Sequence, residues 1–135
     1  MKIAIALSVC AVMLLARMGF AADADEKRAG AASGRQLYHV VSLKFKEGTT
    51  PQQIKEVEKA FEELKTHIPT ITSLHWGTNT SPEKRNHGFT HCFVLTFAAE
   101  KDRDAYLVDP AHKAFGKIAG PVLDDVMVVD FLAQE

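Results

Sequence analysis

Two side chains that commonly transfer protons, Tyr106 and His112, lie six residues apart with Asp109-Pro110 between them. A residue before proline disfavours the α conformation, so the helix that carries Tyr106 should end at Asp109. Asp109 is a favoured N-cap and Pro110 suits the first helical turn, so a second helix should begin at once. His112 then lies at the positive end of a helix dipole, which favours its neutral form. The pair could abstract a proton next to a carbonyl and stabilise the enolate; the alternative is a plain proline break with a surface histidine.

The elements that position this pair follow from the spacing of apolar residues. Strict alternation over 37–45 predicts a strand with one core face. Thr50, Pro51 and Gln53 predict a capped helix start, and the helical spacing continues to Ile68. The patterns predict strands at 37–45, 71–79, 89–97 and 126–131, a helix at 51–68, and helical pieces at 100–108 and 111–120. This β-α-β-β-α-β order is typical of an α+β, ferredoxin-like subunit with a four-stranded antiparallel sheet and both helices on one face.

Two further histidines, His39 and His91, fall on the core faces of the first and third strands. Antiparallel pairing should place them at opposite ends of the sheet. A helix that runs back along the third strand would bring His112 toward His91, so we expect Tyr106, His112 and His91 to share a pocket. His39 should contribute less, as a pocket residue or a hydrogen-bonded core residue. The other residues expected to line this substrate pocket are apolar: Phe61, Phe93, Leu95 and Phe115.

The face of the sheet away from the helices should be apolar and uncovered. We assign Val40, Cys92, Val94, Val126 and Val128 to it. Such a patch is too large for a soluble monomer. A second copy packed face to face would bury it, so the sequence predicts a homodimer.

The first 24 residues have the pattern of a secretory signal peptide. A positive start precedes an apolar run that is too short to span a bilayer, and small residues follow as a cleavage site. We expect residues 1–24 to be a signal peptide, 25–35 a flexible leader and 36–135 the folded domain, with export to the periplasm or the cell exterior. Cleavage removes Lys2, Arg17 and Asp23, so the net charge of −1 becomes −2. No nucleic-acid partner and no stable membrane anchor are expected in the mature chain.

No cofactor and no metal are expected. The sequence has no Gly-rich phosphate loop and no Gly-x-Ser-x-Gly nucleophile elbow. Cys92 should point away from His91 on its strand, so the two cannot share a metal ion. Cys92 is expected to be an inert thiol, since cleavage of the signal would leave it without a partner for an internal disulfide.

Several segments together resemble the stress-responsive dimeric α/β-barrel (Dabb) domain family. They are Tyr38 to Lys46, Trp76-Gly77, Gly88 to His91, Phe97, Tyr106 to His112 with Phe115, and Val129 to Phe131. The resemblance covers nearly the whole expected domain. It implies a ferredoxin-like subunit and a homodimer whose two sheets form a barrel, in a family whose members mostly have no assigned activity.

The chain is also similar to a plant member of this family, a polyketide cyclase that works by intramolecular aldol condensation. That similarity implies His112 as the base, Tyr106 as the acid, and His39 and His91 as pocket residues. The chain departs from the plant pattern at Asp109, which replaces a histidine, and at His75, which replaces an aromatic residue. Both changes alter the polarity expected of the pocket.

The sequence therefore leaves two possible functions open. The first is an exported, dimeric stress-response domain protein with an apolar small-molecule pocket and no assigned activity. The second is a cofactor-independent acid/base enzyme, cyclase-like or a lyase or isomerase, that uses His112 and Tyr106 on a carbonyl-containing ligand.

Overall fold

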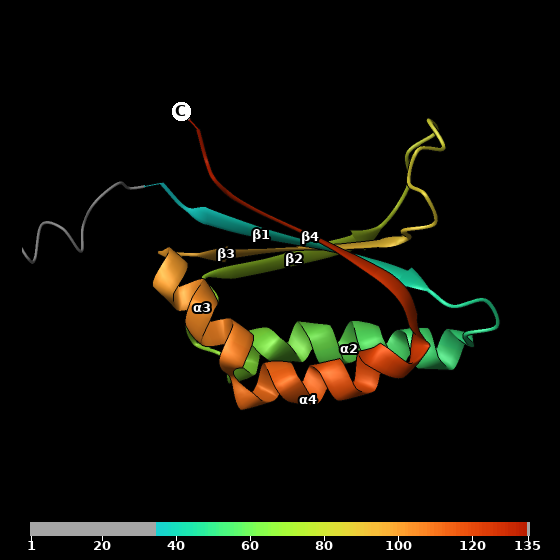
Figure 1. Ribbon diagram of the computed structural model, residues 1–135, viewed down its shortest axis with the longest axis horizontal. Helices are drawn as coiled ribbons and strands as arrows, with labels where there is room; N and C mark the ends of the chain where they lie inside the picture. Colours follow the sequence, from blue (N-terminus) through green and yellow to red (C-terminus); the bar gives the residue numbers. More distant parts are fainter. Residues whose placement is uncertain (1–34, 135) are drawn as a thin grey trace, which may run out of the picture. The chain divides into compact units, whose positions relative to one another are not determined.

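The computed structural model describes residues 35–134, and the predicted signal peptide lies outside them. Two layers form the domain, a four-stranded sheet and a layer of helices against one of its faces (Figure 1). The elements follow in the order β1 (Leu37–Phe45), α2 (Pro51–His67), β2 (Ser73–Thr78), β3 (His91–Phe97), α3 (Glu100–Val108), α4 (Pro110–Ala119), the 3-10 turn η1 (Gly120–Val122) and β4 (Leu123–Leu132). This is the predicted ferredoxin-like order.

The sheet has the strand order β2-β3-β1-β4, and every neighbouring pair is antiparallel. The register places Leu37 opposite Phe97 and Leu43 opposite His91, so the start of β1 lies at the end of β3. The side chains of each strand alternate between an inner face toward the helices and an outer face without helices. The predicted antiparallel α+β architecture is therefore confirmed.

The helix boundaries have the local causes that the sequence indicated. Thr50 caps α2 by accepting from the Gln53 backbone, and the Gln53 side chain accepts from the Thr50 backbone at 2.9 Å. Asp109 ends α3 and caps α4, because its extended backbone leaves the helix and its carboxylate accepts from the Ala111 N–H at 2.7 Å. The break lets α3 and α4 take different directions beneath the sheet (Figure 1).

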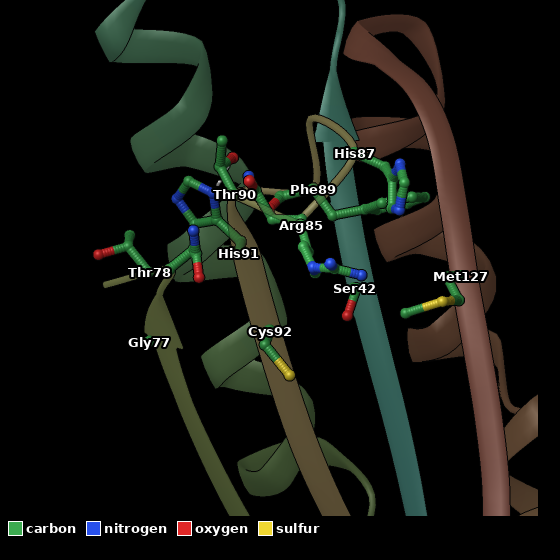
Figure 2. Close-up of a pocket in the computed structure, with 12 residues that line it drawn as sticks. Ser42, Gly77, Thr78, Arg85, His87, Phe89, Thr90, His91, Cys92 and Met127 are labelled. Atoms are coloured by element: carbon green, nitrogen blue, oxygen red, sulfur yellow. Dashed lines mark hydrogen bonds between the residues drawn. The ribbon is translucent and has the colours of Figure 1, made fainter. Parts of the chain in front are cut away.

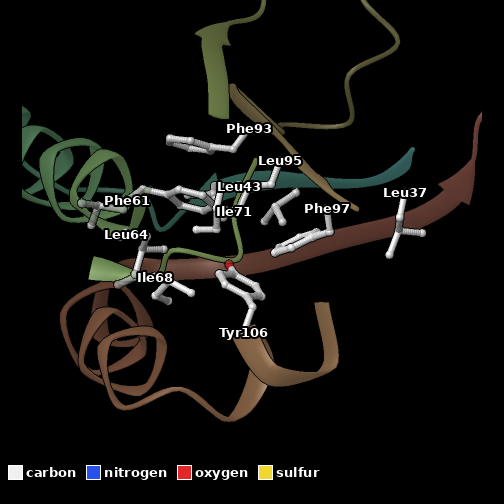
Figure 3. Close-up of a cluster of buried hydrophobic side chains, with 13 residues drawn as sticks. Leu37, Leu43, Phe61, Leu64, Ile68, Ile71, Phe93, Leu95, Phe97 and Tyr106 are labelled. Atoms are coloured by element: carbon white, nitrogen blue, oxygen red, sulfur yellow. The ribbon is translucent and has the colours of Figure 1, made fainter. Parts of the chain in front are cut away.

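The hydrophobic core lies between the inner face and the helices (Figure 3). Phe93, Leu95 and Phe97 of β3 are fully buried in it, and Phe61 of α2 stacks on Phe93 with 3.8 Å between ring centroids. Tyr106 enters the same core from α3 (Figure 3). The tight packing holds the proton-transfer candidates on a rigid base.

The assignment of Val126 and Val128 to the helix-free face is wrong. Val128 pairs with Val41 and Val126 pairs with Leu43, so both valines belong to the inner face. Each is nevertheless about half exposed, at 51% and 43%. We call these two residues the β4 strip. As the edge strand, β4 extends past the helices, so the strip is an accessible apolar surface on the inner side of the sheet.

Candidate functional site

Tyr106 and His112 are in contact across the Asp109 break, with 4.5 Å between their ring centroids. The Tyr106 side chain is only 1% exposed. Burial, followed by the nearby negative charge of Asp130, raises the pKa of the phenol well above its ordinary value, so Tyr106 remains protonated. Its hydroxyl makes no hydrogen bond to any residue in the described range 35–134. The hydroxyl is not one of the fully buried atoms without a partner, since within residues 35–134 only Thr70 Oγ1 is. It therefore keeps contact with solvent, and this donor is available to a bound molecule.

His112 lies in the first turn of α4 and is partly buried. Burial lowers the pKa of its imidazole, which outweighs a hydrogen bond to the Leu107 backbone that raises it. The direction agrees with the sequence argument, but the main cause is desolvation rather than the helix terminus. At neutral pH the ring is therefore uncharged. A neutral imidazole has one nitrogen with a free lone pair, which can accept a proton.

His39 lies on the other side of Tyr106, at 5.5 Å between ring centroids and with the rings edge to face. Its Nδ1 is 2.5 Å from Asp130 Oδ1 on the neighbouring strand. A carboxylate only accepts, so Nδ1 is the donor of this bond. Arg103 of α3 donates to the second oxygen of Asp130. Both oxygens of Asp130 are thus engaged, which fixes the orientation of the His39 ring.

His91 is placed elsewhere, so the expectation that it shares a pocket with Tyr106 and His112 is wrong. It lies at the opposite end of β3, between Phe45 and Trp76. Its Nε2 donates to Glu58 Oε1 at 2.9 Å, and its Nδ1 is 2.8 Å from the Thr90 hydroxyl. Both ring nitrogens are therefore occupied, and His91 joins α2 to the sheet.

The other predicted pocket residues pack against one another. Phe61, Phe93 and Leu95 are at most 1% exposed and fill the core, while Phe115 is partly buried against Phe61 at 4.9 Å between ring centroids. A cavity of about 490 Å³ lies instead at the outer face, between the sheet and the 79–90 loop (Figure 2). Of all the predicted site residues, only His91 lines it.

Sequence reasoning missed Asp130 and Arg103. Asp130 directly follows the apolar run of residues 126–129 in β4, and an acidic residue at an inward position was the available signal. Its face could not be assigned, because the run Val126 to Val129 has no alternation. Arg103 gave no signal, since charged residues dominate its helix.

Residues 35–134 contain no group of three or more His, Cys, Asp or Glu side chains that could hold a metal ion. Within the same range, no helix has both the length and the apolar character needed to cross a membrane.

Comparison with known proteins gives one family and several relatives. The family model described as "Stress responsive A/B Barrel Domain" (Dabb) matches residues 37–133. The chain is 36% identical over 93 residues to the stress-response A/B barrel domain-containing protein HS1 of Arabidopsis thaliana, covering 69% of this chain and 85% of that protein. It is 28% identical to olivetolic acid cyclase of Cannabis sativa, covering 69% of this chain and 92% of the cyclase.

Two solved structures show the same fold. One is a hydroxynitrile lyase from Passiflora edulis, with a TM-score of 0.71, 25% identity, and coverage of 76% of this chain and 97% of the lyase. The other is a dimeric ferredoxin-like protein from Thermobifida fusca, with a TM-score of 0.65, 25% identity, and coverage of 75% of this chain and 93% of that protein. The fold therefore occurs both in enzymes and in proteins without an assigned reaction.

Proposed function

The chain belongs to the stress-responsive A/B barrel (Dabb) domain family, and we propose that it is a cofactor-independent acid/base catalyst for a small carbonyl compound. The observation that carries this proposal is the Tyr106 hydroxyl, which is held protonated, has no hydrogen-bond partner among residues 35–134 and keeps contact with solvent. A neutral imidazole, His112, contacts the same ring. A proton acceptor and a proton donor can thus reach one substrate.

In the proposed reaction, the free nitrogen of His112 removes a proton from the carbon next to the carbonyl. The electrons of the broken C–H bond form the enolate, and the Tyr106 hydroxyl donates a hydrogen bond to its oxygen. The raised pKa of Tyr106 favours such a donor, because the phenol stabilises the negative charge without becoming a buried phenolate. The protonated His112 then returns its proton to the product.

His39 and Asp130 support this site from the other side of Tyr106. Asp130 fixes Nδ1 of His39 as a donor and so holds the His39 ring in place beside Tyr106. The β4 strip ends two residues before Asp130, on the same face. We propose that this strip binds the apolar part of the substrate, since Val126 and Val128 are half exposed where no helix covers them.

The named activities of two relatives support acid/base chemistry in this fold. One relative is a cyclase and another is a hydroxynitrile lyase. The substrates of these two relatives are not assigned to this chain, because the polarity of its site depends on its own carboxylates, Asp109 and Asp130. The supported class is proton abstraction next to a carbonyl, or removal of a hydroxyl proton with cleavage of a bond to the same carbon, which then becomes the carbonyl carbon.

We also propose that the chain forms a homodimer through the outer face of its sheet. Met127, Val129 and Phe131 of β4 are 46–48% exposed there, beside Val40 and Val94. A similar protein of this fold is dimeric. Burial of this apolar face by a second copy would remove it from water.

Export remains a proposal that rests on the pattern of residues 1–24. Mass spectrometry of the chain recovered outside the cytoplasm should show an N-terminus near residue 23 or 25. Recovery of the intact chain only from the cytoplasm would contradict it.

The enzyme proposal can be tested with two small probes, phenylacetone and mandelonitrile. Proton NMR in D₂O follows exchange at the carbon next to the phenylacetone carbonyl, and absorbance follows benzaldehyde release from mandelonitrile. The wild-type protein should accelerate at least one of these reactions. His112→Gln and Tyr106→Phe should each remove most of the acceleration, by about 10²-fold or more for the base.

Two matched variants serve as controls. His67→Gln changes an exposed histidine near the end of α2, and Tyr38→Phe changes the only other tyrosine. Both should retain wild-type rates. Equal losses in the control and site variants, or no dependence on His112 and Tyr106 in an active protein, would refute the assignment.

Ligand binding without turnover is the second candidate function. The accessible valines of the β4 strip favour it, because they supply an apolar surface without any catalytic step. The pH dependence distinguishes the two functions. Binding to the strip alone should be constant between about pH 5 and 8, whereas catalysis should require neutral His112.

A further inference from the structure

Asp109 joins the two residues of the proposed acid/base pair. Its backbone N–H donates to the Tyr106 carbonyl at 3.1 Å, where α3 ends. Its side-chain Oδ1 accepts from the Ala111 N–H at 2.7 Å, where α4 begins. His112 is the third residue of α4, so the capping carboxylate lies at the same helical turn as the imidazole. One residue thus connects the proton donor, the proton acceptor and a negative charge.

The charge of Asp109 is not neutralised by a basic side chain. Within residues 36–134, the lysines and arginines that form ion pairs do so with other carboxylates, namely Glu63, Asp104, Asp124 and Asp130. The second carboxylate of the site, Asp130, is matched by Arg103 and bound to His39. Asp109 is partly buried, so solvent screens its charge less than that of an exposed carboxylate. Asp109 is therefore the uncompensated negative charge of this site.

The groups around the His112 imidazole come from four elements. Burial lowers the pKa of His112 and the nearby His39 of β1 lowers it further, whereas the negative charge of Asp109 raises it. Tyr106 of α3 remains protonated and uncharged. Lys113, the next residue of α4, is exposed, and α2 meets α4 through phenylalanine rings. Asp109 is thus the carboxylate that favours the protonated form of the ring.

This arrangement has two chemical consequences. When His112 removes a proton, its ring becomes an imidazolium in the first turn of α4, where the positive end of the helix dipole disfavours a cation. The Asp109 carboxylate opposes this cost, because a nearby opposite charge favours the charged form of the ring. The same carboxylate repels an anionic group on a molecule that binds beside His112, and such repulsion is a source of specificity.

From these observations we infer that Asp109 is a positioning and specificity-determining residue of the proposed site. Its carboxylate stabilises the imidazolium that His112 forms, and it restricts the ligand to neutral or cationic carbonyl compounds. No proton moves to Asp109, because the proton passes from the substrate carbon to His112 and back. The catalytic part of this inference rests on the proposed function, whereas the charge preference concerns binding alone.

Two variants remove the charge and keep a helix cap. Asparagine and serine are both favoured N-caps, so Asp109→Asn and Asp109→Ser should fold like the wild type. Proton NMR of the full chain follows the titration of the His112 ring, whose signal is identified by its absence in His112→Gln. Its midpoint should be about half a pH unit lower in both variants, the effect of one charge a few ångströms away in a well-solvated site. Glu100→Gln removes an exposed carboxylate from the first turn of α3 and should leave the midpoint unchanged.

Phenylacetone and phenylpyruvate test the charge preference, since the second molecule carries a carboxylate where the first has a methyl group. Titration of each probe, followed by the same NMR signal, should show that the wild-type chain binds phenylacetone more tightly. Both variants should reduce this preference about three-fold, which is the equivalent of half a pH unit. Both should also slow proton exchange of phenylacetone and move the acid limb of its pH profile to lower pH.

Three results would each overturn the inference: an unchanged His112 titration in both variants, equal wild-type affinity for the two probes, or a preference that both variants retain in full. Circular dichroism of each variant distinguishes loss of the charge from loss of folding. A wild-type chain that does not accelerate exchange would refute the proposed catalysis, and the titration and the two affinities would still decide the role of Asp109.

Discussion

Replacement of Tyr106 by phenylalanine should leave the stability of the fold nearly unchanged while it disables the site. The hydroxyl is the only group removed, its side chain is 1% exposed, and no residue in the range 35–134 accepts a hydrogen bond from it. A fully buried polar group without a partner costs about 1–3 kcal/mol. Within residues 35–134 only Thr70 Oγ1 is such a group, so the Tyr106 hydroxyl keeps contact with solvent, and we expect the free energy of unfolding to change by less than about 1 kcal/mol.

Urea denaturation measures this difference, and the melting temperature should change by less than about 4 °C, because 1 kcal/mol shifts it by about 4–8 °C in a domain of this size. Tyr38→Phe is the matched control, since Tyr38 is partly exposed and stacks on Phe131 at 5.0 Å between centroids. Its stability should change little. A loss of about 1 kcal/mol in Tyr106→Phe would show that the hydroxyl has an internal partner, and the argument for a donor reserved for substrate would be refuted.

The remaining predictions concern the base, the carboxylate behind His39 and the dimer. Burial lowers the pKa of His112 below the ordinary value of 6.5. Just below that pH, the folded protein therefore binds fewer protons than the unfolded chain. The contribution of His112 to the free energy of unfolding thus falls as the pH drops through 6.5. A plot of the free energy of unfolding against pH should lose this slope in His112→Gln, and the reaction rate of the wild type should decline only below pH 6.5. Asp130→Leu should lower the free energy of unfolding by about 2 kcal/mol, because the His39 N–H and the guanidinium paired with Asp130 lose their acceptor. Asp130→Asn keeps one acceptor oxygen, so urea titration should show a clearly smaller loss of free energy of unfolding. Val94→Lys should convert the dimer to monomers in light scattering, while Val108→Lys, at a position that is 64% exposed on α3, should leave it intact.

The sequence predicted the elements well because each has a local cause. The alternation of β1, the Thr50-Gln53 capping box and the Asp109-Pro110 break all act within a few residues, and each is confirmed. The face of β4 was predicted incorrectly, because four consecutive apolar residues carry no period of two. Which face Val128 occupies depends on its pairing with Val41, a contact between distant parts of the chain.

The error over His91 has a similar origin and explains how the site is built. α3 has nine residues and rises about 13 Å, whereas the seven residues of β3 span about 23 Å. The chain therefore breaks at Asp109 before α3 could return to the start of β3, and His112 stays near the end of that strand. The start of β1 lies at that same end, because Leu37 pairs with Phe97.

His39 is two residues from that start, so it meets Tyr106, and His91 is left with Glu58 at the other end. The length of α3 thus selects which histidine joins the proton-transfer pair. The sequence contains that length, but its consequence depends on the register of β1 against β3, which no local pattern specifies. The register of β4 against β1 aligns Asp130 with His39, so one end of the sheet assembles the imidazoles, the phenol and the carboxylate that the proposed chemistry requires.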